Sequence, residues 1–157
     1  MYGYVKVGSA VPKLRVADCV YNKEEILKLV EAAAAKQVRV LSFPELSVTG
    51  YTCADLFFQT PLLYAAEQAI QEIAEATEAL NIFLLIGAPI AVDNQMFNCA
   101  VALYKGKLLG IVPKTHIPNY SEFYEERWFA SADDLLTEEI TYAGQNVPIG
   151  ADLIFAA

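Results

Sequence analysis

The chain has 157 residues, of which 55% are hydrophobic and 19% charged, a composition that excludes a disordered chain and suffices for one domain with a sizeable core. The formal net charge of −8 opposes binding to nucleic-acid phosphates or anionic membrane surfaces, so neither partner is expected. The mean hydropathy of +0.33 is high for a monomer and predicts a surface covered by another domain or subunit, as in a homo-oligomer.

Cysteine and histidine usage gives no sign of a disulfide framework or a metal site. Cys19, Cys53 and Cys99 form no CxxC pair, and the single histidine, His116, is not at ligand spacing from any of them. The longest apolar run, residues 82–92, is about half as long as a membrane span requires. The N-terminal segment lacks the layout of a signal peptide. These features predict a cytoplasmic protein without a metal.

The chain opens with a pattern typical of a strand, a helix and a strand. Strands are predicted over residues 4–11 and 14–16, and a further strand over 38–43. Asn22 can cap the intervening helix, with Glu25 reaching back as in a capping box. This order predicts a βαβ unit with parallel strands.

A long helix and a buried strand come next. Thr60-Pro61 is a typical helix start, and apolar spacing extends the helix to residue 80. Its other side carries four glutamates, most simply a solvated face, at positions 67, 72, 75 and 78. The continuous apolar run over 82–86 predicts a strand covered on both faces.

The pattern then changes to antiparallel strands and loops. Strands over 96–104 and 107–112 flank Lys105-Gly106, a hairpin turn signal. Residues 115–129 read as an aromatic and charged loop, and 133–139 as an exposed acidic turn or short helix. The final apolar run, 152–157, predicts the beginning of a strand, and its abrupt end suggests that the domain is truncated there.

Glu45 is the first candidate for chemistry. It follows Pro44, which ends an apolar strand because proline has no N–H to donate. Sites form at this edge of open α/β sheets. Phe43, Leu46 and Val48 surround Glu45, so partial burial is expected to raise its pKa and make it a general base. A solvated loop glutamate is the competing interpretation.

Lys114 is the second candidate. It follows Pro113 at the end of a strand, as Glu45 follows Pro44, so the two opposite charges could meet. An ammonium that holds an oxyanion beside a carboxylate that moves protons suits attack on a carbonyl. The spacing alone favours an ordinary surface lysine.

The remaining reactive side chains have structural interpretations. His116 would need a serine or cysteine partner to act as a base. Cys99 is expected to be a buried thiol, Cys19 has no reactive neighbour, and Cys53 is only a weak candidate near Glu45. A cluster of charged residues follows His116, and we interpret it as a solvated loop with a local ion pair, since most such clusters lie at the surface. Its members are Glu122, Glu125, Glu126 and Arg127.

Two motifs resemble the nitrilase, or carbon–nitrogen hydrolase, superfamily. The first is Phe43-Pro44-Glu45-Leu46-Ser47-Val48-Thr49-Gly50-Tyr51, with Asp55-Leu56-Phe57 after it. The second is Pro113-Lys114-Thr115-His116-Ile117-Pro118-Asn119-Tyr120, continued by Phe123, Glu125, Arg127 and Phe129. The continuation resembles most the glutaminase domains of bacterial glutamine-dependent NAD synthetases. The likeness covers nearly the whole chain.

The resemblance implies an α/β (α+β) fold, the α-β-β-α sandwich of the superfamily, of which this chain holds about the first half. It implies that Glu45 is a general base, that Lys114 stabilises the oxyanion and that Glu125 is a supporting acid. Tyr120 and Phe123 resemble residues of the glutamine pocket. The implied reaction is hydrolysis of the glutamine amide by a cysteine thiolate, with ammonia passing to a synthetase domain that amidates nicotinic acid adenine dinucleotide with ATP and Mg²⁺.

The chain departs from the motif in one respect. The implied nucleophile follows Lys114, yet residues 115–157 contain no cysteine. We therefore interpret residues 1–157 as the N-terminal portion of a glutaminase domain that is inactive alone, without its C-terminal synthetase domain. Two alternatives stay open. One is a stand-alone amidase similar to an omega-amidase, and the other is a non-catalytic binding or assembly module.

Overall fold

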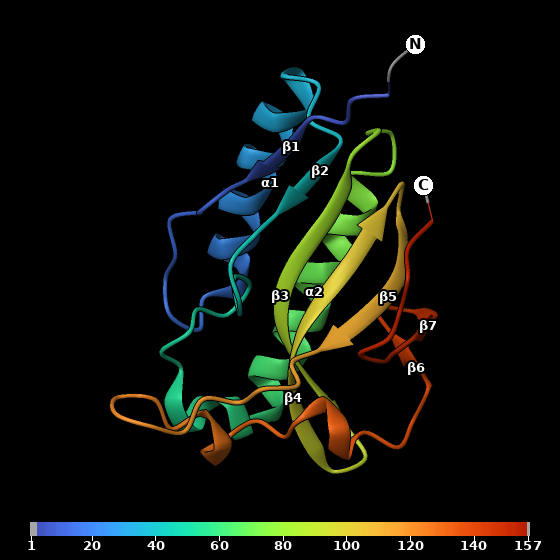
Figure 1. Ribbon diagram of the computed structural model, residues 1–157. Helices are drawn as coiled ribbons and strands as arrows, with labels where there is room; N and C mark the ends of the chain where they lie inside the picture. Colours follow the sequence, from blue (N-terminus) through green and yellow to red (C-terminus); the bar gives the residue numbers. More distant parts are fainter. Residues whose placement is uncertain (1–2, 157) are drawn as a thin grey trace.

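The computed structural model describes residues 3–156, which form one main sheet, two helices and a hairpin (Figure 1). The sheet has five strands in the order β1-β2-β3-β4-β5. These strands are β1 (Val7–Ser9), β2 (Val40–Ser42), β3 (Phe83–Val92), β4 (Gln95–Tyr104) and β5 (Lys107–Pro113). The helices are α1 (Cys19–Ala35) and α2 (Thr60–Ala76), and the hairpin is β6 (Glu139–Tyr142) with β7 (Gln145–Pro148).

The first three strands run parallel, with α1 between β1 and β2 and α2 between β2 and β3. The predicted βαβ order is therefore confirmed. The first strand is shorter than predicted, and residues 14–16 form no strand. Their backbone is held instead by Asn22, whose side-chain amide exchanges two 2.8 Å hydrogen bonds with the N–H and carbonyl of Arg15.

The helix starts also show what local sequence could and could not predict. Asn22 does not cap α1: it lies inside the helix and donates to the carbonyl of Val48, while Asp18 caps the helix by accepting from the N–H of Tyr21. The predicted start of α2 at Thr60 is confirmed. The helix ends at Ala76 rather than near residue 80. At this end the Thr77 hydroxyl donates to the carbonyl of Ile73 at 2.8 Å.

Strands β3, β4 and β5 form an antiparallel meander. The predicted hairpin at Lys105-Gly106 is confirmed, and both turn residues have positive φ, as does the pair Asp93-Asn94 between β3 and β4. Pro89 lies inside β3, where the carbonyls of Leu85 and Gly87 already point away from β4 and accept from Phe43 and Val48. Pro89 lies two residues after Gly87, so its backbone nitrogen also points away from β4. Its missing N–H therefore removes no hydrogen bond to β4.

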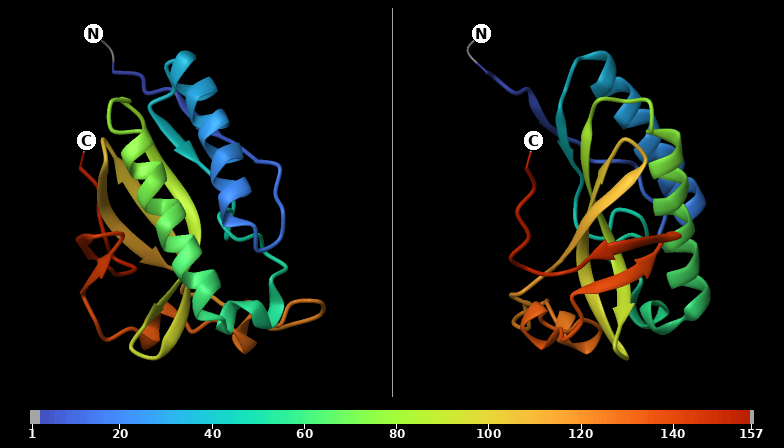
Figure 2. Two further views of the ribbon diagram at one scale, coloured as in Figure 1. Left: turned by 180° about the vertical axis from the view of Figure 1, so that it is seen from behind. Right: turned by 90° about the vertical axis from the view of Figure 1, so that its right-hand side faces the viewer.

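Both helices cover one face of the sheet (Figure 2). Successive residues of a strand point to opposite faces. Leu84 and Ile86 of β3 are fully buried, as are Ile70 and Ile73 of α2 and Ile26 of α1, in one hydrophobic core. At roughly 25 cal/mol per Å² of buried apolar surface, each such side chain stabilises the fold by about 1.5–3 kcal/mol.

The opposite face of the sheet carries the last described residues. The strand predicted over 152–157 is wrong: residues 151–156 form no strand, and Ala157 lies outside the described part. Phe155 packs on Phe83 with ring centroids 5.6 Å apart, and a Cβ at Gly110 would come within 2.9 Å of Leu153 and Phe155. Sequence periodicity missed this segment because a coil that packs on a sheet can be as apolar as a strand.

The β6–β7 hairpin was not predicted. Its turn is Ala143-Gly144, with positive φ at both residues, as at Lys105-Gly106. Glu67 of α2 accepts from the N–H of Ala143 at 2.8 Å, so Glu67 does not belong to the solvated face predicted for α2. The hairpin thereby joins the sheet edge at β5 to the helix layer.

The architecture is mixed α/β, with one helix layer on one sheet, and it matches the fold class expected from the motifs. Within residues 3–156, every helix is too short or too polar to cross a bilayer.

Candidate active site

Glu45 and Lys114 meet at one end of the sheet. The ammonium Nζ of Lys114 lies 2.9 Å from Oε2 of Glu45. Glu45 follows β2, and Lys114 directly follows β5; Asn98 of β4 lies between them and donates from Nδ2 to the same Oε2 at 2.9 Å. Pro44 lies two residues beyond the end of β2, and Pro113 is the last residue of β5. The charged residues that follow these two prolines thus come together, as their placement suggested.

Glu45 is more exposed than its apolar neighbours in the sequence suggested. Its side chain is 52% exposed, whereas Leu46 and Val48 are fully buried. The cause is the backbone: Leu46 has a φ of 52°, so the chain turns sharply after Glu45 and sends Leu46 inward while Glu45 stays at the surface. A positive φ is uncommon for a bulky residue and marks local strain.

Gly87 of β3 allows the Glu45 loop to approach the sheet. A Cβ on Gly87 would lie 2.4 Å from the N of Leu46 and 2.5 Å from the carbonyl oxygen of Pro44. Both are backbone atoms, which cannot rotate away. The Val48 N–H donates to the Gly87 carbonyl at 3.2 Å, so the loop is tied to the strand at this point.

Glu125 completes the cluster. It lies in the short 3₁₀ helix η2 (Glu125–Arg127), is only 2% exposed, and accepts from Lys114 at 3.1 Å and from the Tyr51 hydroxyl at 2.6 Å. Glu125 is therefore no part of a solvated loop. A buried carboxylate needs such donors because loss of its hydration would otherwise be costly.

The cluster fixes the protonation of its donors. Burial works to lower the pKa of Lys114, but hydrogen bonds with Glu45 and Glu125 outweigh burial and raise it above its ordinary value. Burial, and then the hydrogen bond to Glu125, raise the pKa of Tyr51. Both groups therefore remain protonated at neutral pH, with an ammonium held between two carboxylates.

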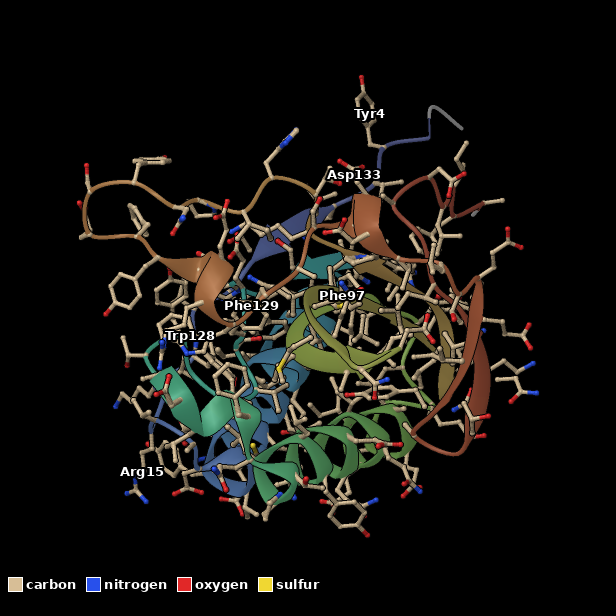
Figure 3. All side chains as sticks on the ribbon, turned by 90° about the horizontal axis from the view of Figure 1, so that it is seen from below. Tyr4, Arg15, Phe97, Trp128, Phe129 and Asp133 are labelled. Carbon is tan, nitrogen blue, oxygen red and sulfur yellow. The ribbon has the colours of Figure 1, made fainter. Side chains whose placement is uncertain are left out.

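A second contact joins the two site loops. Arg127 donates from Nε and Nη2 to the two carboxylate oxygens of Asp55, both at 2.8 Å, and the indole of Trp128 donates to Asp55 at 3.0 Å. Asp55 lies in η1 (Ala54–Phe58), whose Phe57 packs edge-on against Phe129 at 5.0 Å. Trp128 and Phe129 point toward this segment in Figure 3. The ion pair expected within the loop is thus formed with Asp55, far along the chain.

We expect the contact between the loops to weaken on acidification. Hydrogen bonds from Arg127 and then Trp128 hold the pKa of Asp55 at about 2, below its ordinary value of 3.8. Because folding lowers the pKa of Asp55, its ion pair stabilises the fold fully above the ordinary pKa. This stabilisation is lost as the pH falls through the pKa of the folded state. The indole N–H resonance of Trp128, assigned with Trp128→Phe, should titrate with a midpoint near that lower value.

In Asp55→Asn the same resonance should be shifted at neutral pH and should no longer titrate in this range. Asp133→Asn is the matched control because Asp133 is exposed and remote from Trp128 (Figure 3). A Trp128 signal that titrates identically in Asp55→Asn and in the unaltered protein would contradict this assignment.

An open cavity of about 220 Å³ lies beside Glu45 and Lys114. Its floor comes from the sheet face that points away from the helices, through Leu85, Ala100 and Val112. Tyr120 and Phe123 do not line this cavity. They stack on each other with ring centroids 5.9 Å apart, and Tyr120 is 68% exposed, so their predicted role in substrate binding stays a prediction.

The three thiols lie outside the reach of substrate. Cys19, Cys53 and Cys99 are each no more than 3% exposed. Burial raises the pKa of all three, that of Cys19 to about 11, which disfavours the nucleophilic thiolate. Cys99 follows Asn98 on β4, so its side chain points to the helix face while Asn98 points to the cavity. Cys99 is a core thiol, as predicted.

His116 is exposed on the loop after Lys114 and makes no side-chain hydrogen bond within residues 3–156. In the same part of the chain, no three histidine, cysteine, aspartate or glutamate side chains are grouped to hold a metal.

Sequence reasoning missed Asn98 and Gly87. Asn98 had a signal, since a polar residue between the buried Phe97 and Cys99 must find a hydrogen-bond partner. Gly87 had a weaker one, because a glycine inside a strand marks a close approach of backbone.

The comparisons with known proteins point to one family. Residues 6–153 match the family model described as carbon-nitrogen hydrolase. The chain is 36% identical over 155 residues to the glutamine-dependent NAD(+) synthetase of Mycobacterium leprae, a match that covers 99% of this chain and 23% of that protein. The chain thus spans about a quarter of the length of such relatives.

Solved structures give the same picture of the fold. The crystal structure of a glutamine-dependent NAD(+) synthetase from Cytophaga hutchinsonii superposes with a TM-score of 0.89 at 28% identity, covering 98% of this chain and 26% of that one. An amidase from Nesterenkonia sp. superposes with a TM-score of 0.68 at 18% identity, over 90% of this chain and 53% of that one. The second likeness concerns the fold alone.

Proposed function

Because the chain belongs to the carbon–nitrogen hydrolase family, we propose that Glu45, Lys114 and Glu125 form part of an active site that hydrolyses the side-chain amide of glutamine. One observation carries the proposal: the Lys114 ammonium lies 2.9 Å from Glu45 and 3.1 Å from the buried Glu125. A base and a fixed cation at hydrogen-bond distance suit attack of a nucleophile on an amide carbonyl.

In the proposed reaction, a cysteine thiol gives its proton to Glu45 while its sulfur bonds to the amide carbon. Lys114 stabilises the oxygen that becomes negative, and Glu125 holds Lys114 in place. The carbon–nitrogen bond then breaks, and ammonia leaves with the proton from Glu45. Water, deprotonated by Glu45, attacks the thioester, which releases glutamate and restores the thiol.

We place the nucleophile outside Cys19, Cys53 and Cys99. All three are buried with raised pKa values. Cys99 borders the cavity beside Glu45 and Lys114, but its thiol points into the core on the helix side of the sheet. A cysteine elsewhere in the whole protein would therefore have to reach the cavity. On this view the 157 residues are the N-terminal part of a glutaminase domain and do not hydrolyse glutamine alone.

The likeness to synthetases supports a further step. Ammonia released at this site would pass to a synthetase domain that amidates nicotinic acid adenine dinucleotide, with ATP and Mg²⁺ bound to that other domain. No residue of this chain is assigned to those two groups. We also propose a cytoplasmic homo-oligomer, in keeping with the high mean hydropathy.

The test is an assay of the natural full-length protein with glutamine, in which glutamate and ammonia are measured directly. We expect Glu45→Gln to lower this rate about 100-fold, because the general base is lost while the shape is kept. Glu31→Gln is the matched control on the exposed side of α1 and should retain the full rate.

Added ammonium chloride should support formation of the amidated dinucleotide in Glu45→Gln as well as in the unaltered protein. A stand-alone amidase would release ammonia without forming that product. Unaltered protein that releases no ammonia from glutamine, or Glu45→Gln with an unchanged rate, would refute the proposed function.

A further inference from the structure

Asn98 touches both charged residues of the site. Its side-chain amide donates to Glu45 Oε2 at 2.9 Å, and its backbone carbonyl accepts from the N–H of Lys114 at 2.8 Å. Asn98 is 3% exposed and lies in the middle of β4, paired with Pro89 of β3. It is therefore the strand residue that connects the Glu45 loop to the end of β5.

The two oxygens of Glu45 differ in their surroundings. Oε2 accepts from both Asn98 and Lys114, whereas Oε1 accepts no hydrogen bond from residues 3–156. An oxygen with two donors, one of them charged, binds a proton less well than an oxygen with none. Oε1 is consequently the oxygen of Glu45 that is open to receive a proton.

Lys114 cannot fix this orientation by itself. An ammonium is a compact charge on a flexible stem, whereas an amide is a directional donor held here by a buried strand. Glu45 is half exposed, so without a directional donor its carboxylate could rotate and exchange its two oxygens.

We propose that Asn98 is a positioning residue, which presents Oε1 of Glu45 to the proton of the nucleophile and keeps Oε2 of Glu45 directed at Lys114. The proposal rests on the proposed glutamine hydrolysis for its functional meaning. It adds the residue that orients the base and the oxygen that takes the proton. Asn98 acts through Glu45 and is not itself a catalytic residue.

The test compares Asn98→Asp, Asn98→Ala and the control Asn146→Asp in the natural full-length protein. Asn146 lies in β7, exposed and away from the site, so it undergoes the same change of charge elsewhere. Glutamine hydrolysis is followed across pH. The titration of Glu45 is followed by its side-chain carboxyl carbon resonance in protein labelled with ¹³C-glutamate, assigned as the signal that Glu45→Gln lacks.

Asn98→Asp should move both the Glu45 titration and the acidic limb of kcat/KM upward by about one pH unit, because a second carboxylate replaces a donor. Asn98→Ala should lower kcat about tenfold and leave the KM for glutamine within about twofold. Asn146→Asp should change neither. Asn98→Ala introduces no charge, so it remains informative if Asn98→Asp does not fold.

A Glu45 titration that is the same in Asn98→Asp and in the unaltered protein overturns the proposal. A kcat of Asn98→Ala within twofold of the unaltered value does so as well, and makes Asn98 only a satisfied buried amide. If the unaltered protein releases no ammonia from glutamine while Asn98→Asp still raises the Glu45 titration, the proposed function fails and the orientation of Glu45 by Asn98 stands.

Discussion

Replacing Lys114 with methionine is expected to lower the free energy of unfolding by about 3 kcal/mol and the rate of glutamine hydrolysis up to about 1,000-fold. The first effect arises because the Glu125 side chain, 3% exposed, would keep its charge without its cation. The second arises because Lys114 is the cation that lies at hydrogen-bond distance from Glu45, and its charge would stabilise the oxyanion. Chemical denaturation and the glutamine assay on the natural full-length protein measure the two effects.

A double variant separates the two contributions. Lys114→Met combined with Glu125→Gln removes the unpaired charge, and the amide oxygen introduced by the second substitution can still accept from Tyr51, so most of the lost stability should return. The rate should not return. Lys107→Met, an exposed position at the start of β5, the strand that Lys114 follows, is the control for the loss of a lysine. A single variant as stable and active as the unaltered protein would show that the cluster has neither role.

Gly87→Ala is expected to reduce glutamine hydrolysis by more than about 100-fold although Gly87 has no functional group. The added methyl would meet backbone atoms of Leu46 and Pro44 at 2.4 and 2.5 Å, so the loop must move away from β3 and carry Glu45 with it. A displacement of about 1 Å at a reacting group can cost that much rate. Overpacking of this kind should also lower the free energy of unfolding by about 1–3 kcal/mol.

Gly3→Ala is the control, because a Cβ at Gly3 would meet nothing within 4 Å. The glutamine assay and chemical denaturation again give the readout. If Gly87→Ala hydrolysed glutamine at the unaltered rate, the close approach of loop and strand would not be needed for the site.

The parts of the fold that were predicted correctly depend on local chemistry. The turn at Lys105-Gly106 and the start of α2 at Thr60 are specified by adjacent residues, and both are confirmed. Asn22 was misread because its partner, the Val48 carbonyl, is 26 positions away and a capping role fits the local sequence equally well. The burial of Glu45 was misjudged for a similar reason, since it depends on the positive φ of Leu46.

The same distinction holds for the site. The motifs pointed to Glu45, Lys114 and Glu125, which the structure brings together, and their roles remain proposals. Asn98 and Gly87 could not be assigned from the sequence. Their importance follows from contacts with the distant Glu45 loop, the hydrogen bond of Asn98 to Glu45 and the close approach of Pro44 and Leu46 to Gly87, and sequence periodicity does not determine such contacts.

Pro89 also bears on aggregation. The outer edge of β3 beyond Leu85 has no neighbouring strand among residues 3–156, and such an edge is a template for the strand of another chain unless it is covered. The Glu45 loop covers it at Gly87, whose carbonyl accepts from the Val48 N–H. Because Pro89 directs its nitrogen to that edge, an incoming strand would find no donor there to continue a hydrogen-bonded ladder. The proline thus discourages growth of the sheet by strand addition at the edge that holds the Glu45 loop.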